Sequence, residues 1–212
     1  MRLVAIIDYG SGNLRSAAKA FERVAPEDCA ILVTSNPKKL AEATHIVLPG
    51  VGAFADCMEG LQKTSGMLEA LENEVLVKRK PFLGICVGMQ MLFEIGHEHG
   101  VHKGLGWIDG EIIKIDNAGN PQLKVPHMGW NELSITSAHP LLAGINTGAH
   151  VYFVHSYHAI CDDKKDRLAT TDYGSPLAAV VAKDNIMGTQ FHPEKSQETG
   201  LRLISNFLQL GK

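Results

Sequence analysis

Short apolar runs alternate with helix-type patterns through the first half of the chain, and this alternation constrains the fold most. The predicted strands are residues 3–7, 31–33, 46–48 and 82–85. Segments with apolar residues at helical spacing fall between them, at 14–24 and 61–75, and Asn36 followed by Pro37 is typical of a helix start. Repeated strand–helix units predict an α/β fold with a mostly parallel central sheet flanked by helices.

The second half has a different pattern. Strands are predicted at residues 112–115, 130–135, 151–155, 178–182 and 186–191, without helices between them. This pattern predicts an antiparallel extension of the same sheet, closed by a helix near residues 201–210. A length of 212 residues suits one domain, so residues 1–212 are expected to form a single unit.

Composition excludes several classes of protein. Hydrophobic residues make up 45% and charged residues 20%, which is enough for a buried core. A net charge of −3 argues against nucleic-acid binding, and the apolar run at 3–7 meets Asp8 too early for a signal peptide or membrane span. The cysteines, Cys29, Cys57, Cys86 and Cys161, form no Cys-x-x-Cys pair. We therefore expect a cytoplasmic protein without a disulfide framework or zinc knuckle.

A candidate nucleophile lies at the end of the strand predicted at 82–85. Residues 84–88 are Gly-Ile-Cys-Val-Gly, which gives the spacing Gly-x-Cys-x-Gly around Cys86. With serine, this spacing marks the nucleophile elbow, a sharp strand-to-helix turn that needs small neighbours. A helix is predicted to follow through Met89, Leu92 and Phe93, and a helix N-terminus favours a thiolate. Alone, the motif fits a buried cysteine between packing glycines equally well.

A candidate base occurs late in the chain, in Gln190-Phe191-His192-Pro193-Glu194. His192 ends an apolar predicted strand, and on an extended segment Glu194 can point the same way. Glu194 would then orient the imidazole, and His192 would accept the proton of Cys86. An isolated His-x-Glu is more typical of a core histidine beside a surface glutamate. Together with the elbow, it predicts a Cys86–His192–Glu194 triad.

The run Pro49-Gly50-Val51-Gly52 interrupts the strand predicted at 46–48. Acyl transfer needs backbone N–H donors where the oxyanion forms. The N–H of Val87, directly after the nucleophile, is one candidate donor. The glycine-rich turn at Val51 and Gly52 can approach a substrate closely and would supply another. The alternative is an ordinary strand-to-helix loop.

These three motifs together resemble the class I (triad) glutamine amidotransferases. Further stretches are similar to the glutaminase subunits of imidazole glycerol phosphate synthase, an enzyme of histidine biosynthesis. They are Asp8-Tyr9-Gly10-Ser11-Gly12-Asn13-Leu14, Pro126-His127-Met128-Gly129-Trp130-Asn131, Tyr152-Phe153-Val154-His155-Ser156-Tyr157 and the ending His192-Pro193-Glu194-Lys195-Ser196. The similarity runs from Met1 nearly to the C-terminus.

The resemblance implies a reaction and a set of binding residues. Cys86 attacks the carboxamide of L-glutamine, ammonia leaves, and water releases glutamate from the thioester while His192 shuttles protons. The residues expected to hold the glutamine are Gln90, Glu98, Ser156, Tyr157 and the backbone near Gly52. No cofactor and no metal are expected.

The resemblance also implies a heterodimer with a (β/α)8-barrel synthase subunit that consumes the ammonia. The residues expected to face this partner are Asn13, Met128, Gly129, Trp130 and Tyr152. Such glutaminases tend to be nearly silent alone, because hydrolysis without an acceptor wastes glutamine. We therefore expect the turn at 49–52 to rearrange before the oxyanion hole is complete.

Other functions fit the sequence less well. Glutaminases for pyridoxal phosphate or anthranilate synthases are disfavoured by the sequences at 9–13 and 128–131, and a non-catalytic binding module would have lost triad residues. A cysteine peptidase is a weaker alternative. A dinucleotide site at residues 10–12 lacks the third glycine of its motif, because Arg15 stands there. The histidines at 97, 99 and 102 fit solvated loop positions better than metal ligands.

Overall fold

The computed structural model describes residues 2–117, 119, 120 and 122–211. Its helices and strands are, in order, β1 Arg2–Ile7, α1 Leu14–Val24, β2 Cys29–Thr34, α2 Lys38–Glu42, β3 His45–Gly50, α3 Phe54–Lys63, α4 Met67–Leu71, β4 Phe82–Cys86, α5 Val87–Gln90, β5 Phe93–Gly96, β6 His102–Lys103, β7 Ile108–Lys114, β8 His127–Glu132, β9 Ser134–Ile135, β10 His150–His155, β11 Tyr157–Cys161, β12 Arg167–Asp172, β13 Pro176–Lys183, β14 Ile186–Thr189 and α6 Gln197–Phe207. A π-helical stretch, Glu72–Val77, continues α4, and 3-10 turns lie at Pro140–Leu142, Lys164–Asp166 and Pro193–Lys195.

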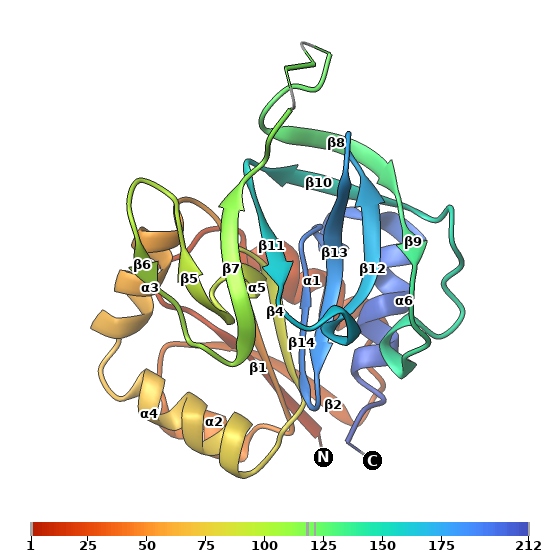
Figure 1. The fold of residues 1–212 in the computed structure, drawn as a ribbon. Helices are drawn as coiled ribbons and strands as arrows, with labels where there is room; N and C mark the ends of the chain where they lie inside the picture. The colour runs from red at the N-terminus through yellow and green to blue at the C-terminus, as the bar shows by residue number, and fades with distance from the viewer. Residues whose placement is uncertain (1, 118, 121, 212) are drawn as a thin grey trace.

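The largest sheet of the described residues has eight strands in the order β2-β1-β3-β4-β14-β13-β12-β9 (Figure 1). The strands from β2 to β14 pair in parallel, and β13, β12 and β9 continue the sheet antiparallel. The predicted mostly parallel α/β sheet with an antiparallel extension is confirmed. Other strands of the second half, together with β5 and β6, form two smaller sheets, β10-β8 and β11-β7-β5-β6, so only part of that half extends the main sheet.

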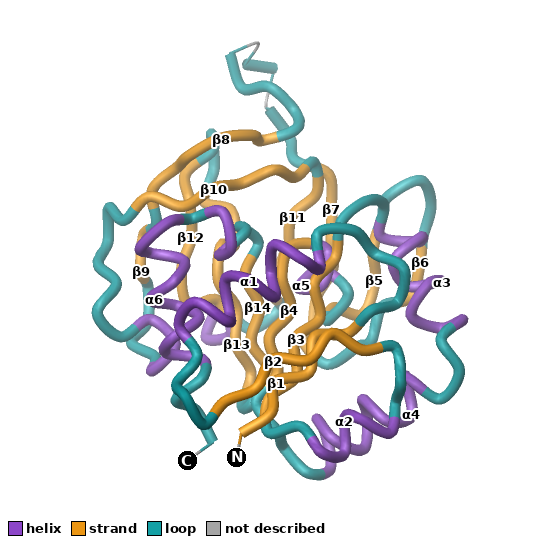
Figure 2. The backbone as a smooth tube through the Cα atoms, turned by 180° about the vertical axis from the view of Figure 1, so that it is seen from behind, coloured by secondary structure: helices purple, strands orange, loops and turns teal. Residues whose placement is uncertain are grey.

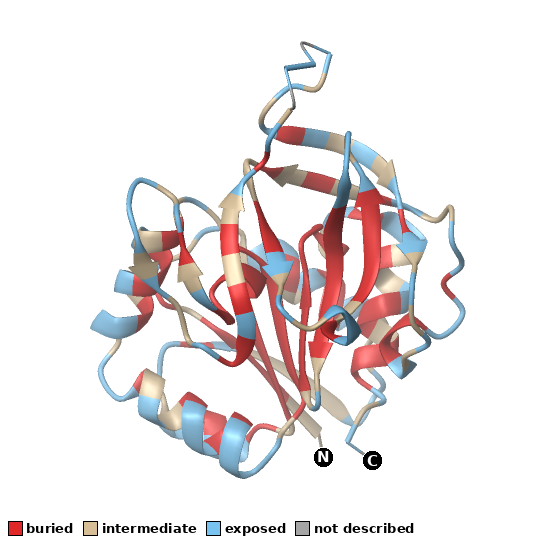
Figure 3. Ribbon diagram, in the orientation of Figure 1, coloured by how far each residue is buried: buried red, intermediate tan, exposed pale blue. Residues whose placement is uncertain are grey.

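Different layers cover the two faces of the main sheet. Helix α1 contacts β2 and packs against α6, and Figure 2 shows α1 in front of the strands on that face. On the other face β11 contacts β13, and β7 and β11 lie in front of the main sheet in Figure 1. The central strands β3 and β4 are buried along their whole length (Figure 3). Polar chemistry is therefore confined to the ends of these strands.

Strand β14 lies beside β4 although the two are far apart in sequence. Gly188 of β14 pairs with Gly84 of β4 in parallel. The carboxyl ends of parallel strands meet at one edge of a sheet. Cys86 ends β4, and His192 follows the end of β14 at Thr189 by three residues, so the pairing brings both to the same edge.

Some predicted elements differ from the structure. The predicted helix over 61–75 is divided, because α3 ends at Lys63 and Gly66 then adopts a left-handed φ of 72°. The helix predicted after the elbow stops at Gln90, and Phe93 instead begins β5, which pairs with β7. A short apolar run fits helix or strand equally well, and here the neighbouring strand decides.

Other strands differ in extent. Strand β3 runs on through Pro49 and Gly50, which pair with β4, although the sequence predicts a break there. The pattern does not predict β12, because its buried residues include the hydroxyl side chains of Thr170 and Thr171.

Membrane-spanning helices and disulfide bonds are two further features that distinguish classes of protein. Among the residues that the structure describes, no helix is both long and apolar enough to cross a membrane. The thiols of Cys29, Cys57, Cys86 and Cys161 are free.

The turn from β4 into α5 is a close approach of backbones. Cys86 has a φ of 56° and a ψ of −113°, a conformation that residues with a Cβ atom adopt only when their surroundings impose it. A Cβ atom on Gly88 would lie 1.8 Å from the carbonyl oxygen of Leu48, and one on Gly84 would lie 2.5 Å from that of Gly88. Glycine is therefore required on both sides of Cys86, as the elbow motif predicts.

We expect Gly88→Ala to lower the free energy of unfolding by at least about 2 kcal/mol, because the methyl group must displace backbone. Gly12→Ala is the control, since its Cβ would meet only the movable side chain of Val51, at 3.2 Å. The free energy of unfolding of Gly12→Ala should differ from that of the wild type by no more than about 0.5 kcal/mol. Urea unfolding of both variants measures the difference, and a Gly88→Ala protein as stable as the wild type would contradict this packing.

Candidate active site

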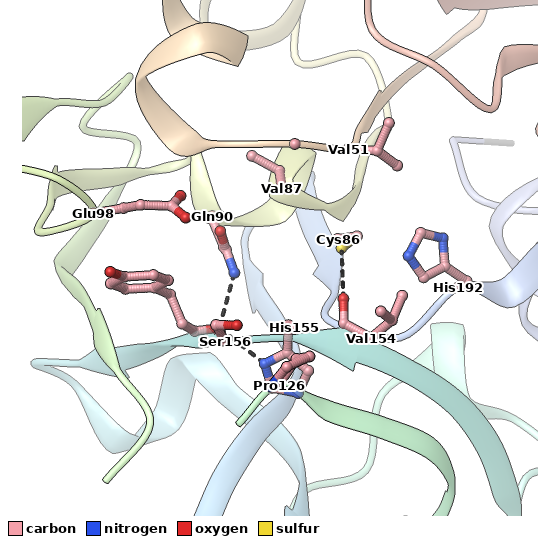
Figure 4. Close-up of a pocket in the computed structure, with 12 residues that line it drawn as sticks. Val51, Cys86, Val87, Gln90, Glu98, Pro126, Val154, His155, Ser156 and His192 are labelled. Carbon is pink, nitrogen blue, oxygen red and sulfur yellow. Dashed lines mark hydrogen bonds between the residues drawn. The ribbon is translucent and has the colours of Figure 1, made fainter. Parts of the chain in front are cut away.

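A cavity of about 310 Å³ opens where β4 ends (Figure 4). Its wall is formed by Val51, Gly52, Cys86, Val87, Gln90, Glu98, Pro126, Val154, His155, Ser156, Tyr157 and His192. This wall contains every residue that the sequence assigns to the oxyanion hole and to glutamine, together with the predicted nucleophile and base. The volume is at the small end of the range for ligand pockets, which suits a small metabolite.

Cys86 lies at the inner end of the cavity, on the strained turn between β4 and α5. Its sulfur lies 4.0 Å from the carbonyl oxygen of Val154, to which the thiol donates (Figure 4). Nε2 of Gln190 donates to the same sulfur at 3.8 Å. The thiol therefore contacts a backbone acceptor and a side-chain donor, and it also lines the cavity.

His192 and Glu194 form a buried pair. Nδ1 of His192 lies 2.8 Å from Oε1 of Glu194, and each side chain is only 1% exposed. A carboxylate only accepts hydrogen bonds, so Nδ1 carries the hydrogen. Nε2 of His192 is buried and has no hydrogen-bond partner within the described residues, and the ring interacts with Cys86 (Figure 4). Nε2 is therefore placed to exchange a proton with the thiol.

The pKa of His192 is raised from its usual 6.5 to about 9. Burial by itself lowers this pKa, but the side-chain interactions with Cys86 and Glu194 outweigh it. The imidazolium form therefore predominates at neutral pH. Its contribution to stability is complete below the unfolded value of 6.5 and is lost as the pH rises through about 9.

Asn13 reaches the same carboxylate from the start of α1. Its Nδ2 donates to Oε1 of Glu194, the atom that also accepts from His192. Asn13 has a left-handed φ of 72°, which asparagine adopts more readily than most residues. The sequence assigns Asn13 to a partner surface. The structure shows that its amide also contacts the carboxylate of the predicted triad.

The backbone from Pro49 to Gly52 is held by side chains on its far side. The N–H of Val51 donates to Oγ of Ser11 at 3.0 Å, and Sγ of Cys57 donates to the carbonyl oxygen of Val51 at 3.4 Å. The hydroxyl of Tyr9 donates to the carbonyl oxygen of Pro49 at 2.8 Å. In this arrangement the Val51 N–H is engaged by Ser11 and does not serve an oxyanion in the cavity.

The residues predicted to hold glutamine are fixed by neighbouring groups. The amide nitrogen of Gln90 donates to the carbonyl oxygen of Tyr157 at 2.9 Å and to Oε1 of Gln190 at 3.0 Å. Oε2 of Glu98 accepts from the N–H of Phe54, the first residue of α3, at 2.7 Å. Gln90 and Glu98 are therefore oriented before any ligand enters.

Gln190 is a site residue to which the sequence assigns no role. It is fully buried and contacts both Cys86 and Gln90 through its amide. The signal available in the sequence is its place in the run that contains His192. The contact itself depends on β14 lying beside β4 and could not be read from the sequence.

The surface predicted to face a partner lies on β8 and β10. Met128 is 63% exposed and Trp130 46% exposed, on either side of Gly129. The ring of Trp130 packs edge-on against Tyr152, its cross-strand neighbour, with centroids 6.0 Å apart. Trp107, in contrast, is buried against Phe82.

The histidines of the loop around residue 100 do not gather into a metal site. Nε2 of His97 lies 2.6 Å from Oε2 of Glu111. Within the described ranges, no group of three or more His, Cys, Asp or Glu side chains is placed to hold a metal ion.

Comparisons with known proteins show the family of this chain. The model of the glutamine amidotransferase class-I family matches residues 5–210. The chain is 57% identical over 210 residues to the imidazole glycerol phosphate synthase subunit HisH of Rhodospirillum rubrum, covering 97% of this chain and 98% of that protein. It is 56% identical over 212 residues to the subunit of the same name from Agrobacterium fabrum, with the same coverage.

Solved structures share the fold at low sequence identity. A crystal structure of a glutamine amidotransferase superposes with a TM-score of 0.73 at 17% identity, covering 97% of this chain and 98% of the other. The structure of PurLQS from Thermotoga maritima gives 0.72 at 19% identity, covering 98% and 97%. From the match over nearly its whole length, the chain belongs to the class-I glutamine amidotransferase family.

Proposed function

We propose that residues 1–212 act as one amidotransferase domain, the glutaminase subunit of an imidazole glycerol phosphate synthase. The observation that carries this proposal is the buried His192–Glu194 pair beside Cys86 at the end of a 310 Å³ cavity. The support for the particular synthase is the 57% identity to a subunit of that enzyme.

In the proposed reaction Nε2 of His192 holds the proton of Cys86, and the thiolate attacks the carboxamide carbon of L-glutamine. The tetrahedral intermediate collapses, its C–N bond breaks, and His192 returns the proton to the leaving nitrogen as ammonia. Water then attacks the thioester, with His192 again taking a proton, and glutamate leaves as the sulfur is released. Glu194 holds the Nδ1–H and stabilises the imidazolium through both steps.

The oxyanion needs two donors, and the proposal assigns them to the N–H groups of Val87 and of the Val51–Gly52 segment. Val51 donates to Ser11 in this structure, so the segment has to turn before its N–H can serve the cavity. Gly52, with a φ of 103°, is the position that can absorb such a change of backbone direction. The free chain is therefore held in a state of low activity.

Glutamine binding is assigned to Gln90, Glu98, Ser156 and Tyr157 with the Gly52 backbone. The amide hydrogens of Gln90 are used within the protein, so its carbonyl oxygen is the end that it offers to a ligand. Glu98 offers carboxylate charge to the α-ammonium group of glutamine.

The proposed partner is a (β/α)8-barrel synthase subunit in a heterodimer. Met128, Gly129, Trp130 and Tyr152 form the proposed docking surface, since exposed Met and Trp side chains are typical of interface anchors. Asn13 would act at the edge of this interface, where it also holds Glu194.

Glutamate release from L-glutamine tests the proposed function directly. We expect the chain with the barrel subunit and its ribonucleotide ligand to release glutamate at least about a hundredfold faster than the chain alone, and Cys86→Ala to abolish the reaction. Silence of the complex, with binding verified, would point to a non-catalytic module. Full activity of the chain alone would point to another amidotransferase.

The titration of His192 tests the buried pair independently of catalysis. We expect its ring to titrate near pH 9 in the wild type, followed by NMR. Glu194→Gln should move the midpoint to lower pH, because the imidazolium loses its carboxylate while burial still disfavours the charge. Glu198→Gln, a change in the first turn of α6, is the control and should leave the midpoint in place. An unchanged midpoint in Glu194→Gln would contradict the pair.

A substitution of Ser11 tests whether its hydrogen bond to the Val51 N–H holds the segment away from the cavity. We expect Ser11→Ala to raise glutamate release by the chain alone about fivefold, because one hydrogen bond that holds the segment away from the cavity is lost. Ser11→Thr keeps the hydroxyl and is the control. A Ser11→Ala chain as silent as the wild type, and equally stable, would show that this bond does not limit activity.

A further inference from the structure

Two buried histidines that the proposed reaction does not use lie at the edge of the cavity. His127 on β8 and His155 on β10 are cross-strand partners, and His155 belongs to the cavity wall. The ring of His127 is stacked between Phe153 and Tyr173, with centroids 4.7 and 4.0 Å away. This packing on both ring faces fixes the plane of the imidazole.

The hydrogen bonds of His155, to the Tyr157 carbonyl and to His127, each have a defined donor and acceptor. Nδ1 of His155 lies 2.8 Å from the carbonyl oxygen of Tyr157, which can only accept, so Nδ1 carries the hydrogen. Nε2 of a neutral His155 is then an acceptor. Nδ1 of His127, 3.0 Å away, must donate to it. Both rings are therefore Nδ1–H tautomers.

The outer end of the pair agrees with this direction. Nδ2 of Asn131 lies 3.3 Å from Nε2 of His127 and also donates to the carbonyl oxygen of Asp172 at 2.9 Å. The N–H of Glu132 donates to Oδ1 of Asn131, which fixes the orientation of the amide. The bonds run one way, from Asn131 through His127 and His155 to the carbonyl of Tyr157.

The pair is uncharged. Burial lowers the pKa of His127 to about 4 and that of His155 to about 3. A proton on either ring would also set two N–H groups against each other, at the bond between the rings or at the bond to Asn131. With both nitrogens occupied, His155 has no lone pair for Cys86, although it lines the same cavity as His192.

The Tyr157 carbonyl joins this chain to the nucleophile. It accepts a second hydrogen bond from Gln90, whose amide also donates to Gln190. Gln190 in turn donates to the sulfur of Cys86. An unbroken series of hydrogen-bonded groups therefore leads from β8 to the thiol.

We propose that His127 and His155 are positioning residues that form a neutral, one-way relay, which fixes the Tyr157 carbonyl and through it Gln90 against Cys86. The relay deepens the proposed function and rests on it. Its outer end, Asn131, lies on the strand that carries Met128 and Trp130. A displacement of β8 by a docked partner therefore reaches the glutamine pocket by this route.

The tautomers can be measured in the free chain without any assay of activity. Long-range ¹H–¹⁵N NMR of the histidine rings at neutral pH should show both His127 and His155 as neutral Nδ1–H forms. In Asn131→Asp the donor to Nε2 of His127 becomes an acceptor, so His127 should gain a hydrogen at Nε2. An Nε2–H tautomer or a charged ring at either position in the wild type would overturn the relay.

Two substitutions by amide side chains test the roles of the two ring nitrogens of His155 one at a time. In His155→Asn the amide can occupy the place of Nδ1 and still donate to Tyr157. In His155→Gln the amide reaches the place of Nε2 and leaves Tyr157 without that donor. The complex with the barrel subunit should show a KM for glutamine about tenfold higher in His155→Gln, and within about twofold of the wild type in His155→Asn.

Further measurements distinguish a failure of the proposed relay from a failure of the proposed function. Alkylation of Cys86 by iodoacetamide, which needs no glutamine pocket, reports whether the nucleophile itself is altered. Equal KM values in the two variants, or a loss of thermal stability without a change in KM, would reduce the histidines to a packing role. A wild-type complex that releases no glutamate would overturn the proposed function instead, and the NMR result would still decide whether the relay exists.

Discussion

The parallel pairing of β14 with β4 is the constraint on which the site depends. It joins segments that are distant in sequence and sets the Cys86 turn and the His192 turn at one edge of the sheet. The backbones there approach so closely that Gly84 and Gly88 cannot carry a Cβ atom. The positive φ of Cys86 is strain of the kind that persists only where the surrounding structure imposes it, and here it aims the thiol into the cavity.

Burial shifts the pKa of these histidines, but their hydrogen-bond partners decide whether the pKa rises or falls. His192 and His155 line one cavity, yet the pKa of the first is raised to about 9 and that of the second is lowered to about 3. His192 has a carboxylate and a thiol beside it, whereas His155 meets a carbonyl and a second neutral ring. Removing a charged group from water costs several kcal/mol unless a counter-charge and hydrogen bonds offset it. Glu194 provides both for His192, and Asn13 in turn donates a hydrogen bond to Glu194.

The structure combines a buried His192–Glu194 pair beside Cys86 with a Val51 N–H that is bonded to Ser11. Ser11 and Cys57 hold opposite polar groups of Val51, so the segment has a defined position rather than a loose one. In the proposed function, a partner that changes this position frees the Val51 N–H to serve as the second oxyanion donor. Asn131, at the outer end of the proposed relay, lies on the same strand as Met128 and Trp130, so the proposed docking surface connects through His127 and His155 to the cavity.

The sequence by itself determined the α/β alternation, the elbow with its required glycines, and the motifs that contain Cys86 and His192, because these follow from local periodicity and from motifs that carry their own geometry. It did not determine where the helix after Cys86 ends, or that Phe93 begins a strand, because a short apolar run fits either state until a neighbour pairs with it. The contacts of Gln190, Asn13 and the two relay histidines were likewise decided only by the tertiary structure. Each of these side chains has a hydrogen-bond partner on an element distant in sequence, and burial makes such a partner obligatory for Gln190, His127 and His155.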